Sequence, residues 1–282
     1  MKLSLNDITF IIVTYKSDNI LKHCLDSLPK ESKKIIIENS NNNNLEKELK
    51  NKYDNIEVII SNNIGMGAGN NIGLKACKTN FAFVLNPDTK FYDNTLKNLI
   101  ETLNEIDDFT LASPLNDNQS FPNYKKSYPF IKTKKNILSV DSIDGFSMLF
   151  NLQKFKDKNF FDENFFLYLE NDDLCLRIKK KEELIFIVTN SLINHEGGIS
   201  KNEKLEYLRN WHWMWSKFYY NRKHNGFLIA ISKISLNFIS ALFKYFFYLL
   251  MFNTHKKTIY KMRICGIYSS ILGKESSFRV ES

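Results

Sequence analysis

Residues 9–13 have the sequence TFIIV, a short run of apolar and β-branched side chains that is typical of a strand buried on both faces. Similar runs follow at 34–37, 57–60 and 81–85, with helical stretches at about 19–28 and 45–53 between the first three. Strands that alternate with helices at this spacing indicate βαβ units in one sheet. The sequence therefore predicts an α/β fold with a mostly parallel central sheet.

Strand-like sequence returns at 144–150 and 184–188, after a stretch from 113 to 140 that contains three prolines. Such a proline-containing, polar and aromatic stretch is typical of a loop-rich excursion over a sheet. We expect this excursion to contact a substrate.

The net charge of the 282-residue chain is +8, but it is unevenly placed. From Lys201 onward there are 14 Lys and Arg against 4 Asp and Glu, and the first 200 residues are close to neutral. The four cysteines, at 24, 77, 175 and 265, show no metal-type spacing, which favours reduced thiols and no zinc site. The N-terminus lacks the apolar region of an export signal, so a cytoplasmic protein is expected.

Glycine is concentrated after the third strand-like run, where the segment 63–73 holds four glycines before a helical stretch. A backbone with few β-carbons lets a ligand approach closely, and a helix N-terminus suits phosphate. The dinucleotide-binding motif belongs on the first strand-to-helix turn, so this segment is a different kind of site. The alternative is a tight turn without a ligand.

A carboxylate, Asp88, follows the fourth strand-like run in the sequence Asn86-Pro87-Asp88. Ligands of open α/β sheets bind at the carboxyl ends of the strands, where Asp88 is expected. His195 likewise follows a strand-like run and stands before two glycines, which makes it a candidate metal or phosphate contact. A turn or cap role for Asp88 and a merely exposed His195 are the alternatives.

Three carboxylates and one amide lie together at Glu170-Asn171-Asp172-Asp173, between the apolar run 165–169 and a helical segment. Carboxylates this close repel one another, so one of them should titrate abnormally or bind a cation, as enzymes often exploit. The alternative is structural, because acids favour the first turn of any helix and Asp173 can pair with Arg177.

In their order and spacing these motifs resemble the large family 2 of glycosyltransferases, especially its bacterial rhamnosyltransferase-like members. The resemblance covers residues 9 to about 225. It rests on Val13-Thr14-Tyr15, Glu38-Asn39-Ser40, Asn63-Ile64-Gly65, Gly69-Asn70-Asn71, Leu85-Asn86-Pro87-Asp88, Asp144-Gly145, the segment 165–177, and His195-Glu196-Gly197-Gly198. It implies a GT-A nucleotide-diphospho-sugar transferase fold with a Rossmann-like, mostly parallel sheet.

The resemblance implies a donor site with a divalent cation, Mg²⁺ or Mn²⁺, held by Asp88 and His195. Asn86 replaces the first acid of the family's D-x-D-like element. Glu38 stands where the family has an acid that accepts a hydrogen bond from a pyrimidine base; uracil and thymine can both donate this bond. The donor-binding residues it implies are Thr14, Tyr15, Glu38, Asn39, Gly65, Gly69, Asn70 and Asn86.

The acidic segment is similar to the family's general-base element, E-D-x-D, in which Asn171 replaces the second residue. An amide cannot accept a proton from a hydroxyl, so the base is Glu170 or Asp172. We favour Glu170, with Asp172 as the alternative and Asp173 as a structural residue.

The C-terminal part, residues 226–282, contains the most apolar stretch of the chain, 227–252, long enough to cross a bilayer. Because Lys233, Asn237, Ser240 and Lys244 recur at helical spacing, we expect an amphipathic helix that lies in a membrane surface, followed by a basic stretch for anionic lipid. The alternative is a helical pair that packs on the GT-A domain, residues 1–225, or on a second copy in a homo-oligomer.

The resemblance implies an inverting, metal-dependent transferase that moves a sugar, with rhamnose as one candidate, from a UDP- or dTDP-sugar to a hydroxyl of a lipid-linked or surface glycan. Its expected place is the inner face of the cell membrane. The alternative is a catalytically weakened GT-A domain that binds nucleotide-sugars or assists assembly. Nucleic acid is not expected as a partner, because the basic C-terminal part carries no recognisable motif.

Overall fold

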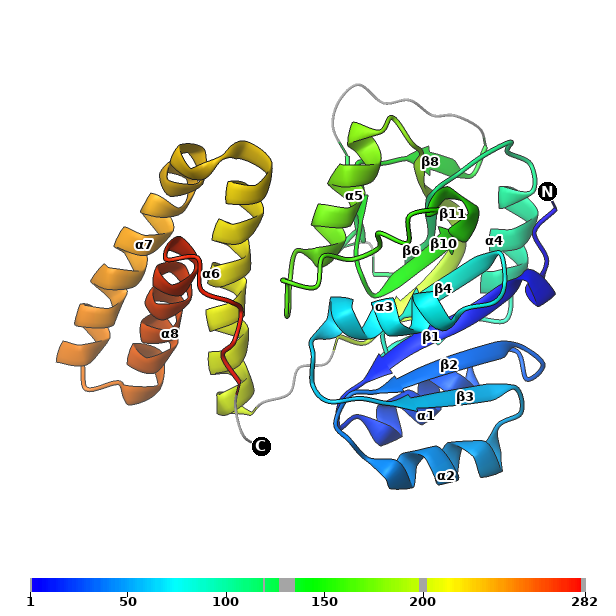
Figure 1. The fold of residues 1–282 in the computed structure, drawn as a ribbon, viewed down its shortest axis with the longest axis horizontal. Helices are drawn as coiled ribbons and strands as arrows, with labels where there is room; N and C mark the ends of the chain where they lie inside the picture. The colour runs from blue at the N-terminus through cyan, green and yellow to red at the C-terminus, as the bar shows by residue number, and fades with distance from the viewer. Residues whose placement is uncertain (1, 119, 127–134, 198–201, 280–282) are drawn as a thin grey trace. The chain divides into compact units, whose positions relative to one another are not determined.

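The computed structural model describes residues 2–118, 120–126, 135–197 and 202–279. The chain divides into two compact units (Figure 1). The first unit comprises residues 1–162 and 171–198, and the second comprises residues 163–170 and 199–282.

The first unit is built on a nine-stranded sheet. Its strands, in spatial order, are β3 (Ile56–Ile60), β2 (Lys33–Glu38), β1 (Ile8–Thr14), β4 (Phe81–Leu85), β10 (Ser147–Asn151), β6 (Leu111–Asn116), β11 (Ile185–His195) and β5 (Thr89–Phe91), and β8 (Ile137–Ser139) also pairs with β11. β3, β2, β1 and β4 are parallel, as the sequence predicts. β6 and β11 run in the same direction as these four, whereas β10, β5 and β8 run in the opposite direction, so the sheet is mostly parallel but mixed.

A short ribbon and two 3-10 helices also belong to the first unit, outside this sheet. β7 (Tyr124–Lys125) and β9 (Ser142–Ile143) form a two-stranded ribbon, and the 3-10 helices are η1 (Leu5–Asp7) and η2 (Leu152–Lys154). The stretch 113–140 is therefore only partly a loop excursion, because its beginning belongs to β6. Residues 127–134 of this stretch lie outside the described residues.

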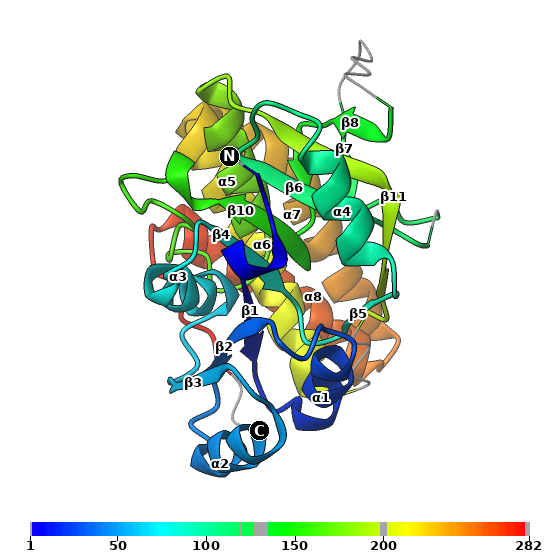
Figure 2. The ribbon, with the colours of Figure 1, turned by 90° about the vertical axis from the view of Figure 1, so that its right-hand side faces the viewer.

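Helices cover both faces of the sheet. α1 (Asp18–Asp26), α2 (Asn43–Lys52) and α4 (Thr95–Leu103) pack into the hydrophobic cluster on one face, and α3 (Met66–Ala76) and α5 (Glu170–Lys180) contribute to the cluster on the other. Figure 2 shows α1 and α3 on opposite sides of β1. This three-layer arrangement buries the strands on both faces, which explains their continuous apolar sequence.

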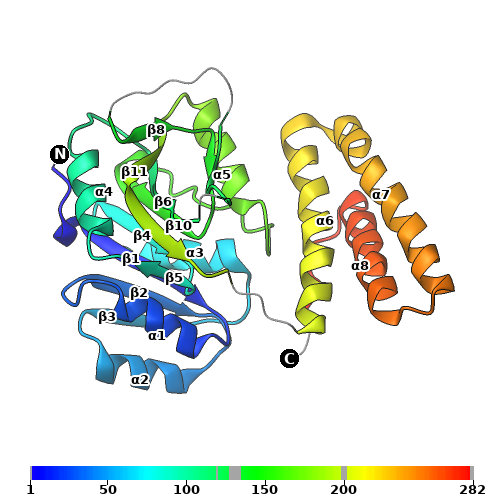
Figure 3. The same ribbon diagram turned by 180° about the vertical axis from the view of Figure 1, so that it is seen from behind.

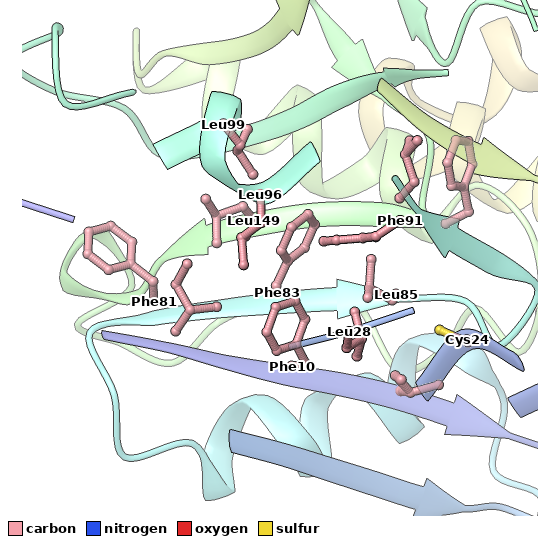
Figure 4. Close-up of a cluster of buried hydrophobic side chains, with 14 of the residues drawn as sticks. Phe10, Cys24, Leu28, Phe81, Phe83, Leu85, Phe91, Leu96, Leu99 and Leu149 are labelled. Atoms are coloured by element: carbon pink, nitrogen blue, oxygen red, sulfur yellow. The ribbon is translucent and has the colours of Figure 1, made fainter. Parts of the chain in front are cut away.

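The run TFIIV supplies both cores with alternate side chains. Phe10 joins the first cluster, where its ring lies 5.7 Å from that of Phe83 and 5.9 Å from that of Phe91 (Figure 4). Ile11 and Val13 point to the opposite cluster. The period of two along β1 therefore decides which helices the strand binds on each face.

Two glycines let α3 lie close to β1. A β-carbon added to Gly73 would come within 2.4 Å of the Ile11 side chain, and one added to Gly69 within 3.0 Å of Val13. Contacts this short between heavy atoms are repulsive, so larger residues would push the helix off the strand. Gly69 and Gly73 therefore have a packing role, independent of any ligand.

The second unit contains three helices, α6 (Glu203–Asn225), α7 (Phe227–Leu250) and α8 (Thr254–Ile271), which pack on one another (Figure 3). α8 approaches α6 closely at Gly266, where an added β-carbon would lie 2.3 Å from the carbonyl oxygen of Trp211. Residues 163–170 belong to this unit, and Ser216 Oγ donates a hydrogen bond of 2.8 Å to the carbonyl of Leu167. Because α6 packs with α7 and α8, it belongs to the second unit, which therefore begins before the predicted domain boundary at 225/226.

α7 has one face in this helical packing and one face exposed. Ala230, Ile234 and Ala241 are buried, and Asn237 faces α6, where its side chain accepts a 2.9 Å hydrogen bond from Lys217. The exposed face carries large apolar residues, Leu228, Leu236, Ile239, Phe243, Phe246 and Leu250, with Lys233 and Lys244 also exposed. Within the described residues, α7 is the one helix whose length and hydropathy would allow it to cross a membrane.

A buried histidine makes the stability of the second unit depend on pH. His212 lies between Ser276 Oγ, 2.8 Å from Nδ1, and the carbonyl of Phe278, 2.8 Å from Nε2. Burial lowers the pKa of His212 from 6.5 to about 4. Between these values the unfolded chain binds a proton that the folded unit does not, so stability falls as the pH falls.

We expect this unit to lose about 3 kcal/mol of unfolding free energy between pH 7 and pH 4, relative to the variant His212→Gln. Urea unfolding followed by tryptophan fluorescence measures it, because Trp211, Trp213 and Trp215 all lie in α6. Equal pH dependence of the two proteins would contradict the prediction.

Candidate active site

A hollow of about 800 Å³ lies between the loops that follow β1 and β2. It is lined by Lys16, Ser17, Asp18, Asn19, Ile20, Ser40, Asn41 and Asn42. Its volume is within the range of about 300–1,000 Å³ that is usual for small-molecule sites. It is at the carboxyl ends of parallel strands, where open α/β sheets bind ligands.

Glu38, predicted to contact a pyrimidine, is fully buried at the end of β2. Its carboxylate accepts hydrogen bonds from the Ser40 hydroxyl, from Ser40 N at 3.0 Å and from Asn42 N at 2.5 Å. Both carboxylate oxygens of Glu38 therefore shape the β2–α2 loop. A pyrimidine bound here would share these oxygens with Ser40 and Asn42. The loop in turn forms one wall of the hollow.

Asp18, which the sequence analysis missed, faces the same hollow. Its Oδ2 accepts a hydrogen bond of 3.3 Å from Asn42 Nδ2, whereas its buried Oδ1 has no partner among the described residues. A buried acceptor without a donor costs free energy, so a ligand N–H or O–H there would be stabilising. The sequence signal was ambiguous, because an Asp in the first turn of a helix is also typical of a cap.

Asn39 and Gly65 hold the loop before α3. Asn39 Nδ2 donates to the carbonyl of Gly65 at 3.4 Å, and Ile64 N donates to Asn39 Oδ1 at 3.4 Å. Gly65 has φ 99°, a backbone conformation that favours glycine. These two predicted donor-binding residues thus fix the loop, while Gly69 packs on β1.

Other predicted donor residues surround the same strand ends. Thr14 ends β1, and Tyr15 follows it, with its carbonyl accepting a hydrogen bond from Ser17 Oγ at 2.9 Å. Thr14 Oγ1 and Asn70 Oδ1 are buried without a partner among the described residues. Asn86 N donates to the carbonyl of Phe146 at 2.9 Å, which joins the end of β4 to β10.

Asp88 and His195, the predicted metal ligands, come together although 107 positions separate them in the chain. β5 follows Asp88 directly and pairs with the end of β11, with Thr89 opposite His195. As a result, Asp88 Oδ1 lies 3.3 Å from His195 Nε2. The ring of Phe146 stacks on the imidazole at 4.1 Å and limits its rotation.

The distance within this pair fits two ligands of one divalent cation, since neighbouring ligands of an octahedral ion at about 2.1 Å are about 3 Å apart. Within the part of the chain that the structure describes, no group of three or more His, Cys, Asp and Glu side chains could hold a metal. Ions such as Mg²⁺ are commonly bound by one or two protein ligands plus substrate phosphates. Asp88 and His195 would be those two ligands.

Two more carboxylates of the first unit, Asp144 and Asp172, interact with each other and with Lys125. Asp172 forms an ion pair with Lys125, in which Oδ1 and Nζ lie 2.6 Å apart. Burial raises the pKa of Asp144, and repulsion from Asp172 adds to this rise while Lys125 and His195 oppose it. The sequence analysis assigned no role to Asp144 or Lys125, because neither stands in a spacing that identifies chemistry.

A hydrogen bond explains why residue 171 is an asparagine although the family has an acid at this position. Its Nδ2 donates a hydrogen bond of 2.9 Å to the carbonyl of Ile143, and its Cβ lies close to Gly145. This bond ties the first turn of α5 to the segment before β10, next to Asp144. A carboxylate could not make it, because an ionised acid has no proton to donate.

We expect Asn171→Asp to lower the unfolding free energy by about 1–2 kcal/mol, since two acceptors would face each other and Asp172 is adjacent. The favourable position of an acid at a helix N-terminus would recover only about 0.5 kcal/mol. Urea unfolding of this variant beside Asn171→Ala, which loses the bond without adding charge, measures the effect. A stabilised Asn171→Asp protein would contradict this account of the residue.

The remaining acids take different places in α5. Asp173 is fully buried and accepts a 2.9 Å bond from Arg177 Nε, which confirms the predicted pair. Glu170 is the first residue of α5 and is 8% exposed, and it is grouped with the second unit. The run 165–169 before it is not a strand, because Phe165 and Phe166 pack on α6 and the chain turns at Tyr168.

The hollow and the Asp88–His195 pair both lie at the carboxyl ends of strands in a sheet that helices cover on both faces. A model of glycosyl transferase family 2 matches residues 9–196. The chain therefore belongs to glycosyl transferase family 2, as its motifs predict.

Comparison with individual proteins agrees with this assignment. The low-salt glycan biosynthesis hexosyltransferase Agl10 of Haloferax volcanii is 24% identical over 196 residues, which cover 63% of this chain and 63% of Agl10. The chain thus matches somewhat less than two thirds of the length of this curated relative.

Two solved glycosyltransferases share the fold. GalNAc-T7, crystallised with UDP, GalNAc and Mn²⁺, superimposes with a TM-score of 0.58 at 14% identity, covering 84% of this chain and 58% of its own. The mannosyltransferase PcManGT of Pyrobaculum calidifontis, solved with GDP-Man and Mn²⁺, has a TM-score of 0.58 at 9% identity. The match covers 97% of this chain and 90% of PcManGT. At these identities the likeness concerns the fold alone.

Proposed function

We propose that the protein transfers a hexosyl group, with rhamnose as one candidate, from a UDP- or dTDP-sugar to a hydroxyl of a lipid-linked or surface glycan. The observation that carries this proposal is the Asp88–His195 pair, whose Oδ1 and Nε2 atoms lie 3.3 Å apart in the unit that also contains the hollow at the ends of β1 and β2. The similarity to the hexosyltransferase Agl10 supports the class of sugar.

The hollow would take the nucleoside of the donor. Asp18 Oδ1 offers an acceptor to an N–H or O–H group of the ligand, and Glu38 holds the loop that forms the wall. Uracil and thymine both carry a proton on N3, so these contacts fit either pyrimidine. Thr14, Tyr15 and Asn70 would border the same ligand.

The diphosphate of the donor would lie at Asp88 and His195, together with Mg²⁺ or Mn²⁺. A bound cation would neutralise the negative charge that develops on the leaving nucleoside diphosphate. Phe146 keeps the His195 ring in place by stacking.

The reaction needs a base for the acceptor hydroxyl. Glu170 would take the proton as the hydroxyl oxygen bonds to the anomeric carbon, and the bond from that carbon to the diphosphate oxygen breaks with both electrons leaving on the diphosphate. Attack from the opposite side inverts the anomeric configuration. Asp172, which forms an ion pair with Lys125, is the alternative base.

We place the protein at the cytoplasmic face of the cell membrane, with α7 in the membrane surface. Soluble helices expose polar faces, whereas Leu236, Phe243 and Leu250 are 72–78% exposed. Lys233 and Lys244 on α7, together with Lys256, Lys257 and Lys261 on α8, would meet anionic headgroups.

We expect the double variant Leu236→Gln/Phe243→Gln to bind vesicles of equimolar phosphatidylcholine and phosphatidylglycerol roughly 100-fold more weakly, because two large apolar side chains no longer enter the lipid. The matched control is Ser232→Gln/Ser240→Gln, which changes two exposed polar residues of the same helix. Co-sedimentation measures the binding. Equal binding of both variants would argue against an interfacial α7.

The second candidate is a nucleotide-sugar-binding or assembly module, which the non-acidic residues Asn86 and Asn171 favour. The two functions differ in turnover. A panel of UDP-, dTDP- and GDP-sugars, tested for metal-dependent thermal stabilisation and then for donor hydrolysis, separates them. Stabilisation by a donor with no hydrolysis and no transfer would favour the module and overturn the transferase.

A further inference from the structure

We infer that the helical unit contains a second site, which binds a phosphate group carried on a lipid. The site is a hollow of about 240 Å³ lined by Tyr168, Arg209, Asn210, Trp213 and Arg263. All five residues belong to the second unit. The hollow is smaller than the range of about 300–1,000 Å³ of whole-ligand pockets, so it suits a head group rather than a nucleotide-sugar.

The charge of the lining selects an anion. Arg209 and Arg263 contribute two guanidinium groups, and the lining contains no carboxylate. Arginine presents its N–H groups in a planar fork that matches two oxygens of a phosphate, and such charge-assisted pairs are among the stronger hydrogen bonds in proteins.

A chain of hydrogen bonds holds Arg263 ready. Asn210 Nδ2 donates to the carbonyl of Glu206 at 2.9 Å, which turns Asn210 Oδ1 toward α8. That oxygen accepts a 2.7 Å bond from Arg263 Nε. The two terminal nitrogens of Arg263 have no hydrogen-bond partner among the described residues, so they remain available to a ligand.

The aromatic residues complete the hollow from the other side. The rings of Tyr168 and Trp213 meet edge to face at 5.4 Å. The Tyr168 hydroxyl has no hydrogen-bond partner within the described chain and could donate to a phosphate oxygen. Burial raises the pKa of Tyr168, so this hydroxyl keeps its proton.

The backbone at Tyr168 is strained, which supports a role in binding. Tyr168 and Leu169 have φ of 72° and 68°, and two consecutive non-glycine residues in this region cost about 1 kcal/mol or more each. The contacts of Phe165 with Tyr219 and of Leu167 with Ser216 hold the segment in this form. The strained turn directs Tyr168 into the hollow, two residues before Glu170.

Two kinds of lipid could supply the phosphate group: a lipid-linked acceptor and a membrane phospholipid. The first ligand rests on the proposed function, and the second does not.

Trp213 allows a direct test, because it is 40% exposed whereas Trp211 and Trp215 are 5% and 3% exposed. Acrylamide quenching of the full-length protein therefore reports mainly on the hollow.

The test measures protection of Trp213 in detergent with EDTA, which removes metal-dependent phosphate binding at Asp88. The probes are a long-chain prenyl phosphate, phosphatidylglycerol and the uncharged prenyl alcohol. We expect phosphate-bearing lipid to protect and the alcohol not to protect. Protection by the prenyl phosphate alone identifies the acceptor, and protection by both lipids identifies a general headgroup site.

Variants tie the protection to the arginines. Arg263→Gln and Arg209→Gln should each weaken the binding at least about ten-fold, and Arg263→Lys should restore only part of it. Lys274→Gln removes the same charge from an exposed residue of this unit and should change the binding less than about two-fold. Equal protection by the alcohol, or wild-type binding by both arginine variants, overturns the inference.

Turnover separates this inference from the proposed function. With a phosphate-linked acceptor, Arg263→Gln should raise the acceptor KM, whereas Lys274→Gln should leave this KM and donor hydrolysis unchanged. If the wild-type protein transfers no sugar, the quenching measurements still decide the phosphate site.

Discussion

Glu170→Gln is expected to lower the rate of sugar transfer by about 10²–10⁴-fold and to leave donor binding nearly unchanged. The amide keeps the size of the side chain but cannot accept the acceptor proton, and a positioned base contributes a factor of this order. Initial rates with the donor that binds best, together with its dissociation constant, measure the two effects separately.

The neighbouring carboxylate provides the comparison. Asp172→Asn keeps a hydrogen-bond acceptor for Lys125 and should cost much less activity than Glu170→Gln. Full activity of Glu170→Gln together with loss of transfer in Asp172→Asn would assign the base to Asp172. Both residues lie in the first turn of α5, so a general disruption of the helix would affect both variants alike.

Asp88→Ala is expected to abolish metal-dependent donor binding and to reduce transfer by at least about 10³-fold. Charge stabilisation by a metal ion and its ligands contributes several kcal/mol to reactions with a phosphate leaving group. Titration with the nucleoside diphosphate, with and without Mn²⁺, measures the change. The same titration of His195→Gln should show a smaller loss, because Asp88 remains.

Asp108→Ala is a suitable control for this experiment. Asp108 forms an exposed ion pair with Lys154, and its removal should leave donor binding unchanged. Metal-dependent binding that survives in Asp88→Ala would refute the assignment of this residue as a ligand.

The parallel half of the sheet was predictable because its strands are continuous apolar runs. TFIIV is buried on both faces, and no polar residue interrupts its alternation between the two cores. The antiparallel strand β10 was not predictable in its place, because Ser147 pairs with Leu85, a contact across 62 positions that no local pattern encodes.

The site was predictable only where a residue follows a strand. Asp88 follows β4 and His195 is the last residue of β11, and the pairing of β5 with β11 brings them together. Asp144 and Lys125 carried no such signal, since their meeting with Asp172 depends on the short β7–β9 ribbon, which no local pattern indicates. The role of Asn171 likewise depends on a distant carbonyl, at Ile143.

The glycines of α3 bear on how relatives of this protein should be compared. An added β-carbon at Gly73 would lie 2.4 Å from Ile11, which cannot be accommodated without a shift, and one at Gly69 would crowd Val13 at 3.0 Å. A descendant that lost catalysis would still be selected to keep them, whereas Asp88 would be free to drift. Retention of these glycines in a distant sequence is therefore a mark of common ancestry and says little about which sugar nucleotide that protein uses.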